Sequence, residues 1–462
     1  MKLYNTRSRS KEDFVPLEEG KLKLYACGPT VYDYFHIGNA RAFITFDVLR
    51  RYFEYLGYEV TYAQNITDID DKIIEKAIAE DKDFSEIADK YTQAFLEDCA
   101  ALGIKPPTAQ PRATEVMPQI IALIEQLVQK GNAYEADGDV YFDTASLPEY
   151  GKLSGKQVED QMAGARVAAN LHKRHPADFT LWKKSKPGEP IWQSPWGDGR
   201  PGWHTECVVM SQHYLGESFD IHGGGIDLVF PHHENENAQA MALTGKPLAR
   251  YWMHNGFLNI DGEKMSKSLK NFFTARDILK EYDAEVIRFF FLSKHYRSPI
   301  DFTRELIEES GKALQNFYKA LSGIDFLSLK HIEIATPEII DIEKAFREAM
   351  DDDFNSARAI ALLFDLAHRV RDPKQDLALR EDAARMLVRL GSVLGFFQNL
   401  EERLQDSMPD LSKQLIEMIL NYRKEARANK DWALSDRLRD DLLALGIEIK
   451  DTAQGTTWNL RK

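Results

Sequence analysis

Two short segments of the sequence combine residue types that bind phosphate. The first, His36-Ile37-Gly38-Asn39, follows an alternating apolar run at 21–26 and is followed by helix-forming residues. This order predicts a strand-to-helix turn whose free backbone amides face an anion. The second, at 263–268, reads Glu-Lys-Met-Ser-Lys-Ser and places Lys264 and Lys267 three residues apart after a turn signal. A surface loop with two lysines could close over a triphosphate.

Four further side chains have the chemistry of a metal site. His232 and Glu236 are four residues apart, so on a helix that begins after Pro231 they would project from one face. Cys27 and Cys207 are predicted at the ends of two strands in opposite halves of the sheet, where a doubly wound fold brings them close. Two thiolates, one imidazole and one carboxylate suit tetrahedral zinc. The ordinary alternatives are two buried small hydrophobes and a solvated helix face.

Histidines crowd around this predicted site in the sequence. Six of the twelve histidines lie between His204 and His254. Such crowding argues against chance placement on the surface. His233 is next to His232 and therefore points to another face, so we expect it to support the metal ligands rather than to be one.

The motifs together resemble the cysteinyl-tRNA synthetase family of class I aminoacyl-tRNA synthetases. The two phosphate segments correspond to the HIGH and KMSKS signatures of that class. Further matching segments are CGPTVYD at 27–33, NITDIDDK at 65–72, GWHTEC at 202–207, HGGGID at 222–227, FPHHENE at 230–236 and GTTW at 455–458. The resemblance covers nearly the whole chain. Its one departure is Asn39 at the fourth position of HIGH, because asparagine can donate a hydrogen bond to phosphate but carries no charge.

The resemblance implies activation of L-cysteine with ATP, release of pyrophosphate, and transfer of cysteine to the terminal adenosine of tRNA(Cys). The catalytic residues it implies are His36, Asn39, Lys264 and Lys267, with Lys267 as the main cation in the transition state. The ATP contacts are His36, Gly38, Asn39, Asp227 and Lys267. The substrate contacts are Thr67 and Trp203, and the tRNA contacts are Arg427, Trp432 and Asp436. The implied cofactors are Mg²⁺ with ATP and one Zn²⁺ on Cys27, Cys207, His232 and Glu236.

A bound zinc ion would explain how the protein selects cysteine over serine. Serine and cysteine have nearly the same shape, and a pocket that only encloses a side chain separates such analogues by about a hundredfold. Zinc binds a thiolate strongly and a serine hydroxyl poorly. We therefore expect no separate editing domain.

The elements that must position these residues predict an α/β fold. We expect a class I Rossmann-type doubly wound parallel sheet, split by an insertion and followed by a helical bundle and a small C-terminal anticodon-binding α+β domain. A helix at 40–56 and a strand at 57–63 begin this pattern, and 275–398 is expected to be helical. The catalytic domain is predicted to consist of a first Rossmann half at 1–117, the insertion at 118–200 and the second half at 201–256. The KMSKS loop and stem-contact region at 257–316, the bundle at 317–400 and the C-terminal domain at 401–462 follow. The C-terminal domain is expected to begin with a polar linker at 401–410.

Composition sets broad limits. The 462 residues are 44% hydrophobic, enough for several cores, and we found no signal-peptide or membrane-helix pattern. Three cysteines argue against a disulfide framework, and Cys99 has no assigned role. We expect a cytoplasmic monomer with no membrane partner. Because the net charge is −14, the tRNA surface must be locally basic, as in the tail segment with Arg423, Lys424, Arg427 and Lys430.

Two other functions remain open from the sequence. One is a cysteine ligase of the mycothiol pathway, which shares the catalytic core, joins cysteine to an amino sugar and lacks the tail. The other is a non-catalytic, metal-dependent RNA-binding module. The basic tail with Trp432 favours tRNA charging over the first, because single-stranded RNA is bound by cations and aromatic rings. The intact segment at 264–268 argues against the second.

Overall fold

The computed structural model describes residues 1–156, 172–260, 262–264, 273–322, 324, 329, 333–406, 410–452 and 455–460. These residues form two compact units. The first comprises 1–306 and 350–356, and the second comprises 307–349 and 357–462.

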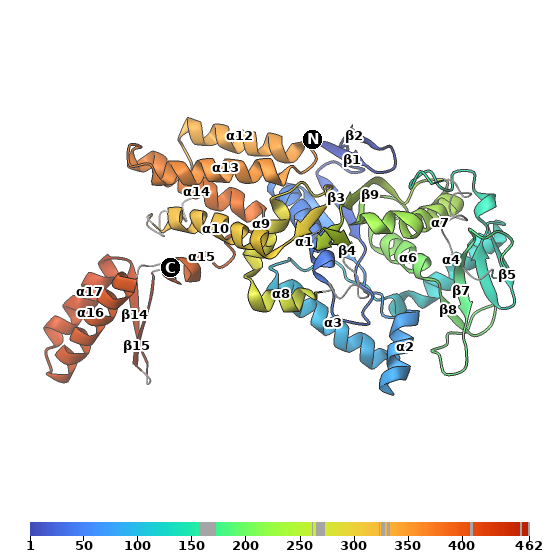
Figure 1. Ribbon diagram of the computed structural model, residues 1–462, viewed down its shortest axis with the longest axis horizontal. Coiled ribbons are helices and arrows are strands. Elements are labelled where there is room, and N and C mark those ends of the chain that lie inside the picture. Colours follow the sequence, from blue (N-terminus) through green and yellow to red (C-terminus); the bar gives the residue numbers. More distant parts are fainter. Residues whose placement is uncertain are drawn as a thin grey trace. The chain divides into compact units, whose positions relative to one another are not determined.

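A parallel sheet is the centre of the first unit (Figure 1). Its strands are β3 (Lys21–Ala26), β4 (Glu59–Gln64), β9 (Phe219–Gly225) and β10 (Ala249–Asn255), in the order β10-β9-β3-β4. All neighbours are parallel. The chain moves outward from β3 in one direction and from β9 in the other, so the switch point lies between these two strands. The predicted doubly wound sheet is therefore confirmed.

Helices cover the two faces of this sheet. Helix α1 (Ile37–Tyr55) connects β3 to β4, and α7 (Glu234–Thr244) connects β9 to β10 in the opposite direction along the sheet. Because such crossovers are right-handed, the two helices lie on opposite faces. Phe46 of α1 packs directly on Gly223, where a Cβ atom would lie 2.1 Å from the ring. Gly223 thus lets α1 approach β9 closely.

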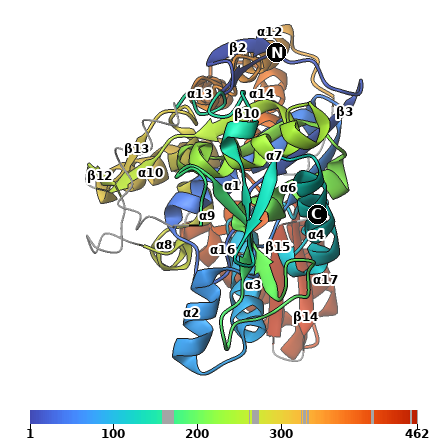
Figure 2. The ribbon, with the colours of Figure 1, turned by 90° about the vertical axis from the view of Figure 1, so that its right-hand side faces the viewer.

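The insertion is a second, antiparallel sheet with the order β5-β6-β7-β8, on the side of the unit that faces the viewer in Figure 2. The predicted hairpin around Val140–Phe142 is confirmed, because Ala133 pairs with Phe142. The elements of the insertion and of the chain that leads into it are the short η1 (Ala113–Val116), α4 (Met117–Gln129), β5 (Ala133–Ala136), β6 (Asp139–Phe142), η2 (Thr144–Ser146), β7 (Phe179–Lys184) and β8 (Gly199–Pro201). Helix α6 (Trp203–Leu215) then returns the chain to the parallel sheet and packs against α7.

A small three-stranded sheet follows β10. Strand β11 (Leu258–Ile260) pairs antiparallel with β12 (Glu263–Lys264) and parallel with β13 (Ile300–Phe302). The expectation of continuous helix from 275 onward is therefore wrong at β13, which is too short for a clear periodic signal. The remaining elements of the first unit are β1 (Lys2–Asn5), β2 (Ser10–Asp13), α2 (Asp71–Glu80), α3 (Phe84–Ala101), the turns η3 (Ile226–Leu228) and η4 (Val229–His233), α8 (Ala275–Glu281) and α9 (Ala284–Leu292).

The second unit begins within α10 and is helical up to its final hairpin. The predicted linker at 401–410 is wrong for 401–406, which lie in a helix whose Leu404 is buried. At the end of the chain, Ile416, Leu442 and Ile447 form a small core against which Trp458 packs. The elements are α10 (Arg304–Leu321), α12 (Pro337–Asp351), α13 (Ser356–Arg371), α14 (Leu377–Val393), α15 (Leu400–Asp406), α16 (Asp410–Ala428), α17 (Trp432–Ala444), β14 (Ile447–Thr452) and β15 (Gly455–Leu460).

None of the helices in the described part of the chain has the length and apolar composition of a membrane span.

Candidate active site

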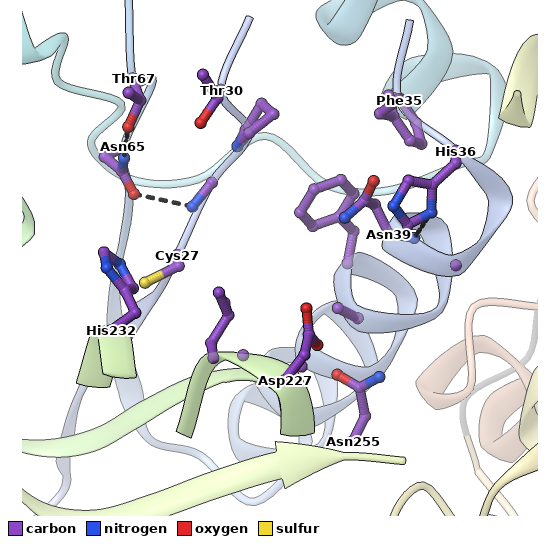
Figure 3. Close-up of a pocket in the computed structure, with 18 of the residues that line it drawn as sticks. Cys27, Thr30, Phe35, His36, Asn39, Asn65, Thr67, Asp227, His232 and Asn255 are labelled. Atoms are coloured by element: carbon purple, nitrogen blue, oxygen red, sulfur yellow. Dashed lines mark hydrogen bonds between the residues drawn. The ribbon is translucent and has the colours of Figure 1, made fainter. Parts of the chain in front are cut away.

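A cavity of about 440 Å³ opens where β3 and β9 end, at the switch point of the parallel sheet. Figure 3 shows Cys27 and His232 at one end of it and His36 and Asn39, at the start of α1, at the other. Asp227 lies between them. One cavity therefore joins the two groups of residues that the sequence singles out.

The four predicted metal ligands meet at the inner end. The ligand atoms of Cys27, Cys207, His232 and Glu236 lie within 4.8 Å of one another. Cys207, His232 and Glu236 are buried, and Cys27 is half-buried where it lines the cavity. Cys207 Sγ lies 3.6 Å from His232 Nε2, and Cys27 Sγ lies 3.7 Å from Glu236 Oε1. His232 Nε2 is 2.8 Å from the same carboxylate oxygen. Two sulfurs, a nitrogen and an oxygen thus converge from four separate segments.

Two of these ligands come from elements other than those predicted. Cys207 lies in α6 and not at the end of a strand. The buried apolar run Cys207–Met210 is compatible with either a strand or a helix, and packing against α7 decides for the helix. His232 lies in the short π-helical turn Val229–His233, and α7 begins only at Glu234. The spacing of four residues still brings His232 and Glu236 together.

A second set of possible ligands overlaps the first. Cys27, His222, His233 and Glu236 also have ligand atoms within 4.8 Å of one another. Cys27, Cys207 and His232 line the cavity, whereas His222 and His233 stand behind this lining in the described part of the chain. The first set is therefore the one that a bound substrate can reach.

The histidines behind the ligands orient them. His222 Nε2 lies 2.7 Å from Glu236 Oε2, and His233 Nε2 lies 3.3 Å from Cys27 Sγ. His204 Nδ1 lies 2.9 Å from His232 Nδ1. His233 thus contacts one of the proposed ligands, and its supporting role stays a prediction. Sequence reasoning gave no role to His222 or His204, although the crowding of histidines was a signal for both.

The cluster contains groups already in the form that binds a cation and groups that must first lose a proton. Burial would lower the pKa of His232, but Glu236 and Cys207 outweigh it and raise this pKa to about 10. A hydrogen bond from Cys27 lowers the pKa of Cys207 to about 6, with a further contribution from His232. Burial raises the pKa of the Cys27 thiol. Burial would also raise the pKa of Glu236, but the imidazoles of His232 and His222 outweigh it and hold that pKa well below its usual range. Cys207 and Glu236 are therefore in the forms that bind a metal ion, whereas Cys27 and His232 would release a proton when a metal ion binds.

Trp203 and Thr67 line the cavity near the cluster. The Trp203 ring stacks on His232 with centroids 4.0 Å apart. The Thr67 hydroxyl accepts a hydrogen bond from Asn65 Nδ2 at 3.0 Å, and Asn65 Oδ1 accepts one from Gly28 N at 2.8 Å. A Cβ atom on Gly28 would lie 1.7 Å from the Asn65 carbonyl oxygen, so this position requires glycine. Asn65 is a functional candidate that sequence reasoning quoted in a motif but did not assign.

At the outer end, His36 is the N-cap of α1. Its Nδ1 accepts a hydrogen bond from the backbone N–H of Asn39 at 3.2 Å. In the neutral imidazole the proton is therefore on Nε2, which makes this nitrogen the donor. Gly38 and Asn39 also line the cavity, and Asp227 lies between this end and the donor cluster. The helix start offers backbone amides and a positive dipole end to an anion.

The lysine segment is described only at its flanks. Lys264 pairs through its backbone with Asn259 of β11, while Lys267 lies outside the described residues. After the segment, Phe273 O accepts a hydrogen bond from Ile37 N at 3.0 Å, and Phe35 O accepts one from Ala275 N at 3.0 Å. The far flank of the segment therefore runs directly beside the His36 turn.

The predicted tRNA contacts lie at the end of the second unit. Trp432 and Asp436 are exposed and one turn apart on α17, so they share a face. Arg427 is exposed on α16 and forms an ion pair with Asp451. Arg423 was also expected among the RNA-facing cations, and this is wrong: it is buried, and its guanidinium donates two hydrogen bonds of 3.0 Å to Asp451.

Known structures with similar folds define the class. The chain is similar to a LeuRS–tRNA–LeuAMS complex from Agrobacterium radiobacter, at 13% identity and a TM-score of 0.64 over 86% of each chain. It is also similar to methionyl-tRNA synthetase of Mycobacterium tuberculosis in complex with methionyl-adenylate, at 15% identity and a TM-score of 0.60 over 87% of this chain and 94% of that one. The fold is that of a class I aminoacyl-tRNA synthetase.

Sequence comparison then identifies the family. Residues 13–312 match the model of the class I (C) tRNA synthetase catalytic domain, 345–398 match the DALR domain, and 408–458 match the cysteinyl-tRNA ligase anticodon binding domain. The cysteine–tRNA ligase of Geobacter sulfurreducens is 50% identical over 480 residues, covering 100% of both chains. That of Clostridioides difficile is 50% identical over 467 residues and 99% of both. The chain belongs to the cysteine–tRNA ligase family.

Proposed function

We propose that this protein activates L-cysteine with ATP and transfers the cysteinyl group to the 3′-terminal adenosine of tRNA(Cys). The observation that carries the proposal is the single cavity with a buried sulfur, nitrogen and oxygen donor cluster at one end and a helix start at the other. A substrate thiol at the first and an ATP phosphate at the second would place the cysteine carboxylate between them.

The donor cluster is proposed to hold one zinc ion. The set of Cys27, Cys207, His232 and Glu236 fits zinc, because it has soft and borderline ligands and the low pKa of Cys207 supplies a thiolate. A bound zinc ion would supply a soft Lewis acid that prefers a substrate thiolate to a serine hydroxyl. His222 would keep the Glu236 carboxylate oriented and His233 would keep the Cys27 sulfur oriented, because each histidine nitrogen contacts that group.

The chain's other residues would place and activate the substrates. Trp203 would form one wall of the cysteine pocket, and Thr67, fixed by Asn65, another. The carboxylate of cysteine attacks the α-phosphorus of ATP, an oxygen–phosphorus bond forms, and pyrophosphate leaves with the electrons of the broken bond. His36 Nε2–H, the Asn39 side chain and the start of α1 would donate to the phosphates, and Gly38 leaves room for the adenosine.

The remaining roles are proposed for groups along the rest of the cavity and for the second unit. Lys264 and Lys267 would neutralise charge that develops on the phosphates, with Mg²⁺ bound to the ATP. Asp227 would accept hydrogen bonds from the ribose hydroxyls. Arg427, Trp432 and Asp436 would contact the anticodon, because they are exposed in the span that matches an anticodon-binding domain. The six-part division predicted from the sequence stays our proposal for the domain boundaries.

The test is exchange of pyrophosphate into ATP, measured with cysteine and with serine, together with charging of tRNA(Cys). We expect exchange with cysteine, almost none with serine, and formation of cysteinyl-tRNA. Exchange that is equal for both amino acids would contradict the selecting role of the cluster. A protein that joins cysteine to an amino sugar and charges no tRNA would contradict the whole proposal.

A further inference from the structure

Arg41 is a fully buried cation two residues after Asn39. Its side chain lies on α1 and the residue is 1% exposed. Its guanidinium donates hydrogen bonds to the carbonyl oxygens of Gly256 and Phe257, both at 2.8 Å. The other terminal nitrogen donates to the carbonyl oxygens of Ser298 at 2.5 Å and Tyr296 at 3.1 Å, with a longer contact of 3.4 Å to His295.

These acceptors are all main-chain carbonyls, which a planar fork of N–H groups can bind simultaneously. A lysine has a single nitrogen and cannot reach both groups of carbonyls with the same geometry. Burial lowers the pKa of Arg41 to about 10, so the guanidinium still carries its charge at neutral pH. The arginine is therefore a cross-link between segments more than two hundred residues apart in the sequence.

The two segments that Arg41 binds are the starts of paired strands. Gly256 and Phe257 come immediately before β11, and Tyr296 to Ser298 come before β13, the parallel partner of β11. Gly256 N donates to Tyr296 O at 2.8 Å, and Ile300 N donates to Phe257 O at 3.1 Å. Arg41 thus binds the base of the three-stranded sheet, and in this sheet β11 pairs with β12, which bears Lys264.

The same helix start also binds the other flank of the lysine segment. Ile37 donates to Phe273, and Ala275 donates to Phe35, directly beside the His36 turn. Both flanks of 265–272 are therefore fixed to the first two turns of α1: one through backbone hydrogen bonds, and the other through Arg41 and the small sheet.

We propose that Arg41 is a positioning residue for amino-acid activation, because it fixes Gly256 and Phe257, which line the cavity at the base of the β12-β11-β13 sheet, to the phosphate-binding start of α1. The inference rests on the proposed function, because it assumes that ATP binds at the start of α1. Arg41 itself is buried and is not among the described residues that line the cavity, so it would act through the residues that it binds.

A second buried arginine provides a matched control. Arg288 on α9 is 0% exposed and donates to Asp47 at 2.7 Å and to the carbonyl oxygen of Gly103 at 3.1 Å. None of these partners belongs to the described lining of the cavity. Its removal should destabilise the same unit without moving the base of the small sheet.

The experiment compares Arg41→Met, Arg41→Lys and Arg288→Met by thermal unfolding, by cysteine binding, and by pyrophosphate exchange per folded molecule. We expect Arg41→Met to lower the exchange kcat by about a hundredfold, with cysteine affinity changed by less than about threefold. Arg41→Lys should recover part of the rate. Arg288→Met should lose stability and keep exchange within about threefold of the unmodified chain.

Gly256→Ala examines the same junction from the other side and replaces Arg41→Met if that variant does not fold. An added Cβ would lie 2.5 Å from Arg297 O and 2.7 Å from Ser298 O, which would push the two segments apart. Its kinetic defect should match that of Arg41→Met. Exchange at the normal rate in the folded Arg41 variants, or an equal loss in Arg288→Met, would overturn the proposal. Exchange by the unmodified chain tests the proposed function separately.

Discussion

The two regions proposed to recognise substrate are built in opposite ways. The donor cluster at the inner end of the cavity is buried except at Cys27, which is half-buried, and its ligands contact one another and the neighbouring histidines. The residues of α16 and α17 that are proposed to contact the anticodon are exposed, with Trp432 at 59%. A small thiol offers few atoms, so its recognition depends on strong interactions in a medium of low dielectric constant. A tRNA offers a large surface, so many weak contacts in water suffice.

The largest effect should come from breaking the buried cluster. Cys207→Ala and His232→Ala each remove one ligand and leave the remaining charges buried without a full set of partners. We expect the zinc content of purified protein to fall from one per chain to nearly none, and activation to fall more than about a hundredfold. Metal analysis and pyrophosphate exchange are the measurements. Cys99→Ala is the control and should retain zinc; stoichiometric zinc in both ligand variants would remove the site as described.

The lysine segment should give the next largest effect. If Lys267 stabilises phosphate charge mainly in the transition state, Lys267→Ala should slow adenylate formation by about two to three orders of magnitude. The dissociation constant of cysteine should hardly change, because the donor cluster is intact. Rapid-quench measurements of adenylate formation should compare Lys267→Ala with Lys246→Ala. Lys246 is an exposed lysine of the same unit and serves as the control. A normal rate of adenylate formation in Lys267→Ala would exclude a role of this lysine in the activation step.

Removal of the exposed region should separate the two steps of the reaction. The buried Leu404 belongs to α15, so the chain should be cut after Asp406 and not at 401. The truncated chain should exchange pyrophosphate normally with cysteine, but charge tRNA about a hundredfold more slowly. Arg427→Ala should slow charging less than truncation does. It should weaken the binding free energy of tRNA by at most a few kcal/mol, because only one exposed contact with the RNA is lost. Equal rates of charging by the truncated and full chains would show that the region after Asp406 does not recognise the tRNA.

The smallest effect concerns stability and pH. Hydrogen bonds from Arg423, Thr456 and Arg427 hold the pKa of Asp451 well below its usual range. A carboxylate with a depressed pKa stabilises the fold above its unfolded pKa of about 3.9 and loses this contribution as pH falls further. Asp451→Asn should therefore lower the unfolding free energy at pH 7 by about 1 kcal/mol after discount for its exposure, and by less at pH 3. Equal losses at both pH values would exclude an ionic origin.

Sequence reasoning was most successful where chemistry is local. The four proposed metal ligands, which the structure brings together, could be singled out because cysteine is rare in this chain and the motifs are specific. The turn proposed to bind phosphate could be singled out because His36 and Gly38 follow a clear strand. It failed where packing decides. The run Cys207–Met210 is apolar enough for a strand or a helix. Arg423 looks like an RNA contact until the hairpin brings Asp451 to it, and the contact of His222 with Glu236 exists only in the folded chain.

The cap of α1 determines how much sequence variation the phosphate turn can tolerate. The hydrogen bond that fixes the His36 ring comes from the backbone N–H of residue 39 and not from its side chain. Any residue other than proline can supply this N–H group. The side chain at position 39 can therefore change from histidine to asparagine while the orientation and tautomer of His36 are preserved. Divergence at the fourth signature position should alter the strength of phosphate contact and leave the helix cap intact.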